Sequence, residues 1–176
     1  MDSQYGLFWD CDGTIMDTEK LYAFAWKDHL KNLGFEIQLS EVEQFIGVDD
    51  RIVHKYFSSF VELQDFTNTM QSLGDIIKNS LSDEILFEDA FNLLISSGEI
   101  GIKSACVSAS PQELLEYKLS RANIEQSFDY IIGGDQVNRN KPYPDIYNKP
   151  IAKLGTTKNI IIEDSPTGIK AGKSSN

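Results

Sequence analysis

The sequence has few cysteines and no long apolar run. Its two cysteines, Cys11 and Cys106, each lie within a short apolar stretch of the 176 residues. Two cysteines exclude a disulfide framework and are typical of a protein in a reducing compartment. No apolar stretch approaches the roughly 20 residues that a membrane-spanning helix needs. The first residues do not form a charged segment before a long apolar one, so we expect no signal peptide. These absences predict a cytoplasmic protein that does not associate with membranes.

Basic residues are scarce relative to acidic ones. The chain has 16 Lys and Arg against 27 Asp and Glu, a net charge of -11. This balance argues against a nucleic-acid partner, because binding a phosphate backbone needs a basic surface. An acidic protein that handles phosphate needs a metal cation to offset its own negative field. The hydrophobic fraction of 41% is typical of a globular chain with a real core.

Short apolar runs alternate with helical patterns outside residues 16–83. The predicted strands are a run ending at Trp9 and the segments Ile102–Val107, Phe128–Ile132 and Asn159–Ile162. Alternation of strands and helices predicts an α/β fold with a doubly wound parallel sheet. Between Pro142 and Pro150 we expect a loop with a short helix, and from Ile151 to Leu154 a helix.

Residues 16–83 have helical patterns alone. Tyr22, Trp26, Leu30 and Leu33 recur at helical spacing, and Ser40–Glu43 has the form of a capping box. Further helices are predicted from Asp49 or Asp50 and over Asp65–Leu81. We therefore predict an all-helical cap at 16–83, inserted into an α/β core made of 1–15 and 84–176.

Polar side chains follow the predicted strands at the points where the strands end. They are Asp10 and Asp12 after the first, Ser108 and Ser110 after the second, Lys141 after the third, and Glu163 and Asp164 after the fourth. The carboxyl ends of such strands converge on one crevice, where ligands bind. Each group has an ordinary alternative: Asp-x-Asp is common in turns, Ser110 can cap a helix, and a lone loop lysine is usually solvated. Together, however, carboxylates, a hydroxyl and a lysine are what phosphoryl transfer from a monoester requires.

Four motifs in this order resemble those of the haloacid dehalogenase superfamily, in its phosphatase and β-phosphoglucomutase-like branch. They are Asp10-Cys11-Asp12-Gly13-Thr14, Val107-Ser108-Ala109-Ser110, Lys141-Pro142-Tyr143-Pro144-Asp145, and Glu163-Asp164-Ser165-Pro166-Thr167-Gly168. They cover the chain from residue 5 to its end, and the helical insertion corresponds to the mobile cap of this family.

The resemblance implies a role for each site residue. Asp10 would attack phosphorus, and Asp12 would act as general acid and then as general base. Mg²⁺ would be held by the Asp10 carboxylate, the Asp12 backbone carbonyl and Asp164. Glu163 would be a further ligand or would contact the ligands without binding the metal. The remaining implied residues would contact the phosphoryl group or the rest of the substrate. They are Ser108, Lys141, Gly13, Thr14 and Ala109, with Arg51 of the cap as a specificity residue or a solvated charge.

The resemblance therefore implies a Mg²⁺-dependent phosphatase acting on a small phosphomonoester, as a monomer or weak homodimer. Two alternatives stay open: a β-phosphoglucomutase-like phosphosugar mutase, and an inactive binding or regulatory module. Members of the family usually continue through a further strand after the fourth motif, whereas this sequence ends at Asn176. We expect an unpaired sheet edge beside the fourth strand.

Overall fold

The chain forms two compact units in a computed structural model that describes residues 4–46, 48–81 and 85–175. One unit comprises Met1–Asp17 and Asp83–Asn176, and the other comprises Thr18–Ser82. The sequence predicts the helical insertion at 16–83, and the second unit spans Thr18–Ser82.

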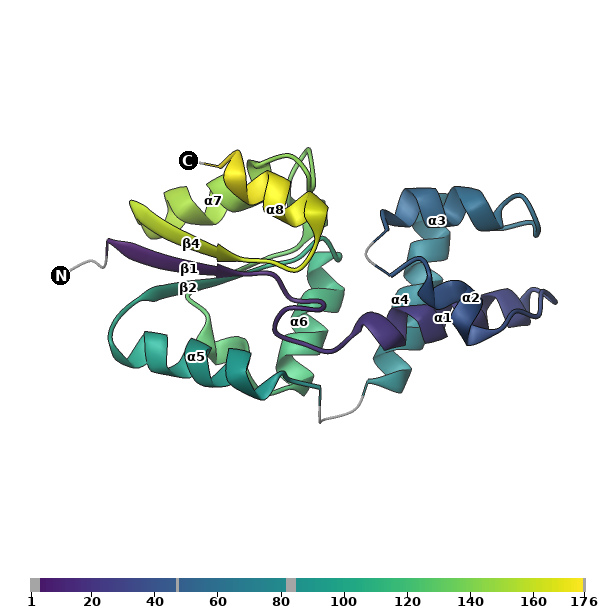
Figure 1. The fold of residues 1–176 in the computed structure, drawn as a ribbon, viewed down its shortest axis with the longest axis horizontal. Helices are drawn as coiled ribbons and strands as arrows, with labels where there is room; N and C mark the ends of the chain where they lie inside the picture. The colour runs from purple at the N-terminus through teal and green to yellow at the C-terminus, as the bar shows by residue number, and fades with distance from the viewer. Residues whose placement is uncertain (1–3, 47, 82–84, 176) are drawn as a thin grey trace. The chain divides into compact units, whose positions relative to one another are not determined.

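A four-stranded parallel sheet forms the centre of the first unit (Figure 1). Its strands are β1 (Tyr5–Trp9), β2 (Lys103–Val107), β3 (Tyr130–Ile132) and β4 (Lys158–Ile162), in the order β3-β2-β1-β4. In the register, Phe8 of β1 lies between Ala105 of β2 and Ile161 of β4. The predicted α/β class with a parallel sheet is confirmed. A parallel sheet buries both faces, which explains why its inner strands are apolar runs.

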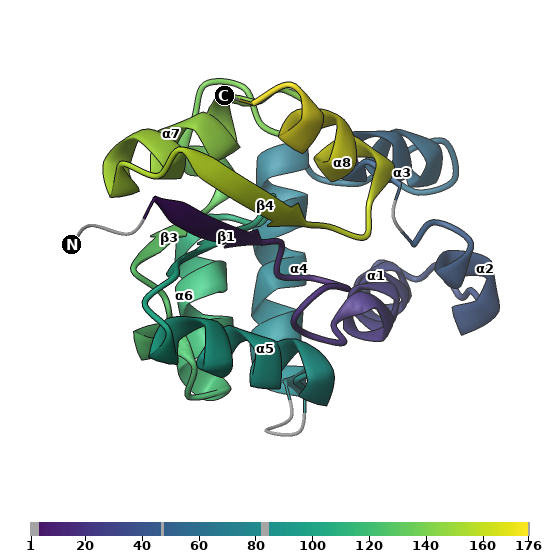
Figure 2. The ribbon, with the colours of Figure 1, turned by 60° about the vertical axis from the view of Figure 1, so that its left-hand side comes forward.

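Helices cover both faces of the sheet (Figure 2). α5 (Glu88–Glu99) and α6 (Gln112–Arg121) lie on one side, and α7 (Asp145–Leu154) and α8 (Pro166–Lys173) on the other. Short 3₁₀ turns occupy Glu125–Ser127 and Gly134–Gln136. Over the described residues, every helix falls short of the length or the apolarity that crossing a membrane would need.

α7 corrects the expectation of a separate loop before residue 151. The helix is continuous and contains Pro150, which cannot donate the usual hydrogen bond to residue 146. Ile146, Tyr147, Pro150 and Ile151 are all buried. Three of them pack in one cluster with Phe8 and other sheet residues. Burial of this apolar face outweighs one missing hydrogen bond, so the helix continues through the proline.

The second unit is helical, as predicted. Its helices are α1 (Glu19–Asn32), α2 (Leu39–Glu43), α3 (Asp50–Phe57) and α4 (Phe66–Ser80). Phe57 is fully buried, and its ring centroid lies 5.3 Å from that of Trp26 and 5.5 Å from that of Phe45. The capping box of α2 uses Gln38 and Glu41, so the expectation that it begins at Ser40 was wrong. The Gln38 N–H donates to Glu41 Oε2 at 3.0 Å, and the Glu41 N–H donates to the Gln38 backbone carbonyl at 3.1 Å.

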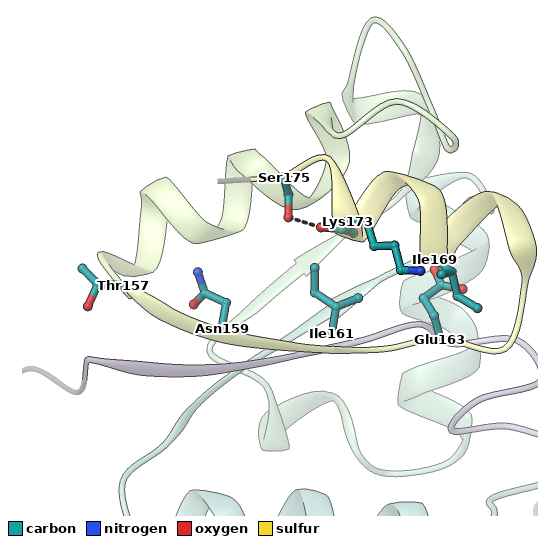
Figure 3. Close-up of a pocket in the computed structure, with 8 residues that line it drawn as sticks. Thr157, Asn159, Ile161, Glu163, Ile169, Lys173 and Ser175 are labelled. Atoms are coloured by element: carbon teal, nitrogen blue, oxygen red, sulfur yellow. Dashed lines mark hydrogen bonds between the residues drawn. The ribbon is translucent and has the colours of Figure 1, made fainter.

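β4 is at the edge of the sheet and, among the described strands, pairs with β1 alone. This is the edge that we expected to be unpaired, and Ile160 on it is 62% exposed. A hollow of about 400 Å³ lies between β4 and α8 (Figure 3). Thr157, Asn159, Ile161 and Glu163 line it from alternate positions along β4 and the residues directly before and after it. Glu163 stands where the hollow meets the carboxyl end of β4.

Candidate active site

Asp10 is the first residue beyond β1 and is buried at the carboxyl end of the sheet. Its backbone N–H donates to the Ile162 carbonyl at 2.9 Å, which fixes the chain against the end of β4. The Lys141 ammonium donates to Asp10 Oδ1 at 2.5 Å. Burial raises the pKa of Asp10 to about 7, although Lys141 acts in the opposite direction.

Lys141 lies between two carboxylates. Its Nζ is 2.5 Å from Asp10 Oδ1 and 2.5 Å from Glu163 Oε1, and it also donates to the Val107 carbonyl at 3.0 Å. Burial works against the ammonium form, but Asp10 and Glu163 outweigh it, so the pKa of Lys141 is raised. Asn140 fixes the loop that carries the lysine, because its side chain bonds both the Lys141 N–H and the Ala109 carbonyl.

Two hydroxyl groups hold the Glu163 carboxyl group in place. The Tyr147 hydroxyl donates to Glu163 Oε1 at 2.5 Å, and the Ser165 hydroxyl donates to Oε2 at 3.0 Å. Burial and then the nearby Glu163 charge raise the pKa of Tyr147, so the phenol stays a donor. A Cβ on Gly168 would lie 1.9 Å from the Glu163 carboxyl group. Only glycine lets α8 approach this side chain so closely.

Three carboxylates come close enough to hold one cation. Oxygens of Asp10, Glu163 and Asp164 all lie within 4.8 Å of one another. The Thr14 hydroxyl donates to Asp164 Oδ1 at 3.4 Å, and burial raises the pKa of Asp164. An all-oxygen donor set of this kind fits a hard cation such as Mg²⁺. The side chain of Asp12 is not part of this group.

Asp12 instead faces a second lysine, which the sequence did not single out. Lys118 Nζ of α6 donates to Asp12 Oδ1 at 2.5 Å and to Oδ2 at 2.7 Å. The Ser108 and Ser110 hydroxyls donate to the same Oδ2 at 3.2 and 3.1 Å. Ser110 therefore is not the cap of α6, whose N-cap is Pro111 and makes no side-chain bond. Strand alternation stops at Trp9, and the carboxylates of Asp10 and Asp12 bind different lysines.

The other predicted substrate residues are arranged as follows. Gly13 has φ +79° in the turn after β1, and its N–H donates to the Met16 carbonyl at 2.8 Å. Ala109 presents its carbonyl to Asn140. Arg51 belongs to the other unit, where its guanidinium lies 4.7 Å from the centroid of the Phe66 ring.

Comparison with known proteins gives consistent results. A family model described as haloacid dehalogenase-like hydrolase matches residues 7–176. The chain is 29% identical over 175 residues to the phosphorylated carbohydrates phosphatase of Thermotoga maritima, covering 96% of this chain and 80% of that protein. It is 23% identical over 174 residues to the fructose-1-phosphate phosphatase of Escherichia coli, covering 96% and 90%.

Solved structures share the fold. A Thermotoga maritima protein described as a candidate β-phosphoglucomutase superposes with a TM-score of 0.78 at 28% identity, over 97% of this chain and 81% of that one. A family hydrolase of Entamoeba histolytica superposes with a TM-score of 0.85 at 24% identity, over 97% and 80%. The resemblance drawn from the four motifs is confirmed, including its phosphatase and β-phosphoglucomutase-like branch. The predicted class of enzyme agrees with the phosphatase names of these relatives. The chain belongs to the haloacid dehalogenase-like hydrolases.

Proposed function

We propose that this protein is a Mg²⁺-dependent phosphatase of small phosphomonoesters that works through an aspartyl phosphate on Asp10. One observation carries the proposal. Carboxylate oxygens of Asp10, Glu163 and Asp164 lie within 4.8 Å of one another at the carboxyl ends of β1 and β4, and Lys141 pairs with the first two. Carboxylates this close repel one another, so the arrangement favours a site that receives cations.

In the first step, an Asp10 carboxylate oxygen attacks phosphorus and the bond from phosphorus to the ester oxygen breaks. The electron pair goes to the leaving oxygen, which takes a proton from the protonated form of Asp12 and leaves Asp12 as the carboxylate. Lys141 is the group best placed to hold the phosphoryl oxygens, because its ammonium already contacts the attacking carboxylate.

In the second step, water attacks phosphorus of the aspartyl phosphate and gives its proton to Asp12. The bond between phosphorus and Asp10 breaks, which releases inorganic phosphate and restores the carboxylate. The cation would be held by Asp10, Asp164 and Glu163, with the Asp12 backbone carbonyl as a further ligand. When bound, it would offset the negative charge of the phosphoryl group.

The substrate class is proposed from the relatives. Two of them are named for phosphorylated carbohydrates and for fructose 1-phosphate. We propose that this chain acts on sugar phosphates or similar small metabolites. Thr14, Ala109 and Gly13 would line the phosphate end of the site, and Arg51 would contact the rest of the substrate.

Phosphate release from a panel of sugar and polyol phosphates tests the proposal, with Mg²⁺ and with EDTA. The expected result is release that needs Mg²⁺ and that Asp10→Asn abolishes while the variant stays folded. Release that continues in EDTA, or in Asp10→Asn at a rate near wild type, would contradict it. A folded wild-type protein that releases no phosphate would favour the binding module instead.

A phosphosugar mutase is the second candidate, favoured by the similarity to the candidate β-phosphoglucomutase. In a mutase the phosphoryl group on Asp10 passes to a sugar hydroxyl rather than to water. The two are separated with glucose 1-phosphate as substrate. Conversion to glucose 6-phosphate that requires glucose 1,6-bisphosphate indicates a mutase, and steady phosphate release indicates a phosphatase.

A further inference from the structure

Lys118 is a buried lysine on the apolar face of a helix. The buried residues of α6 are Leu114, Leu115, Lys118 and Leu119, which recur at helical spacing. The Lys118 side chain is 0% exposed. A charged group in such a place is costly to bury unless it is paired and hydrogen-bonded. Its position therefore needs a reason beyond packing.

The reason lies in what its ammonium contacts. Lys118 Nζ lies 2.5 and 2.7 Å from the two oxygens of Asp12, and it also donates to the Ser110 hydroxyl at 3.3 Å. The Ser110 hydroxyl in turn donates to Asp12, and the Ser110 N–H donates to the Ser108 hydroxyl at 3.1 Å. One helix and the end of β2 thus form a single hydrogen-bonded network around this carboxylate.

The network binds Asp12, whereas Asp10 contacts a different lysine. Asp10 pairs with Lys141, whereas Asp12 pairs with Lys118. The Asp12 side chain is 23% exposed, so the network holds a carboxylate that still reaches solvent at the site. A general acid must be held within hydrogen-bond reach of the atom it protonates, and a misplaced one loses much of its effect.

From this geometry we infer that Lys118 is a positioning residue of the reaction, which fixes the Asp12 carboxylate through a buried ion pair. The inference rests on the proposed role of Asp12 as general acid and base. Lys118 itself touches neither substrate nor nucleophile in this account. The two serines supplement the ion pair but do not replace it, because each supplies one neutral donor.

The kinetic test compares Lys118→Met with wild type on two kinds of ester. Methionine keeps the length of the side chain and removes its charge. Single-turnover cleavage of an alkyl phosphate, whose leaving group needs a proton, should fall about tenfold or more. Release of p-nitrophenolate from p-nitrophenyl phosphate, which needs no proton, should change less than about twofold in the same experiment. Lys153→Met, an exposed change on α7, is the matched control.

Equal losses of single-turnover rate on both esters would show a structural role for Lys118 and overturn the inference. An unchanged rate on the alkyl ester would also overturn it. A wild-type protein that cleaves neither ester would contradict the proposed function instead.

Unfolding midpoints then test the ion pair without turnover. Lys118→Met should lower the midpoint of wild type but raise that of Asp12→Asn, because in that background the buried ammonium has lost its carboxylate and the substitution removes a costly buried charge. A lowered midpoint in both backgrounds would overturn the inference whether or not the protein is active.

Discussion

Lys141 offers the sharpest test of the electrostatics of the site. Its ammonium lies 2.5 Å from both Asp10 and Glu163, and its side chain is 4% exposed. Lys141→Met removes the counterion and leaves two buried carboxylates. Removing one partner of a buried pair costs about 3–5 kcal/mol. In a chain of this size each kcal/mol lowers the unfolding midpoint by about 2–4 °C, so we expect a fall of roughly 6–20 °C.

The fall of the unfolding midpoint in Lys141→Met should depend on pH. The pKa of Lys141 is raised in the folded protein, so its stabilising effect is fully present below its unfolded pKa of 10.5. The carboxyl group of Asp10 has a pKa of about 7 in wild type. Without the lysine, it avoids the cost of a buried negative charge only by binding a proton. Protons are available at pH 5 and scarce at pH 8. The difference between Lys141→Met and wild type should therefore be larger at pH 8.

Thermal unfolding in EDTA buffer at both values of pH measures this difference. Lys149→Met is the matched control, because Lys149 is exposed on the same loop-and-helix segment and bonds only a backbone carbonyl among the contacts described. An unfolding midpoint for Lys141→Met equal to that of the control would contradict a stabilising role for the Lys141 charge. So would a fall of the same size at pH 5 and pH 8.

Three further predictions concern neighbouring residues. Burial raises the pKa of Asp10 from 3.8 to about 7, so the folded state loses stability as pH rises through this range. In EDTA at pH 8, Asp10→Asn should therefore have a higher unfolding midpoint than wild type, and a lower midpoint would contradict this prediction. Asp12→Ala should slow both formation and hydrolysis of the aspartyl phosphate, by about 10²–10⁴ in single-turnover assays, and an unchanged rate would remove the acid–base assignment. Gly168→Ala would place a Cβ 1.9 Å from the Glu163 carboxyl group. Urea unfolding should show that the free energy of unfolding falls by about 1–3 kcal/mol. Gly98→Ala, with open space around its Cβ, should show no such loss.

The sheet and the helical unit could be predicted because their signals are local. The apolar runs before Asp10 and Asp164 are strands, and the turn residues after them end those strands. Where a signal had two readings, tertiary contacts decided between them. Ser110 has the sequence of a helix cap, but its hydroxyl bonds Asp12. Pro150 has the sequence of a helix breaker, but its neighbours are buried in the core.

Lys118 could not be predicted to lie at the site, since a lysine inside a helix ordinarily faces water. Its position between Leu115 and Leu119 on the buried face was the available signal. The grouping of Asp10, Lys141 and Glu163 follows from the convergence of strand ends, which sequence can indicate but not measure. The roles of these residues stay predictions, as does that of Arg51.

Asp10 is the proposed nucleophile. Borohydride reduces an aspartyl phosphate, but not a free carboxylate, to homoserine, so it marks the residue that carried the phosphoryl group. We would quench a reaction of protein, Mg²⁺ and its best phosphate ester with borohydride and sequence the N-terminal peptide by mass spectrometry. We expect homoserine at position 10, and only when the ester is present. Homoserine at position 12, or turnover that leaves both aspartates intact, would contradict it.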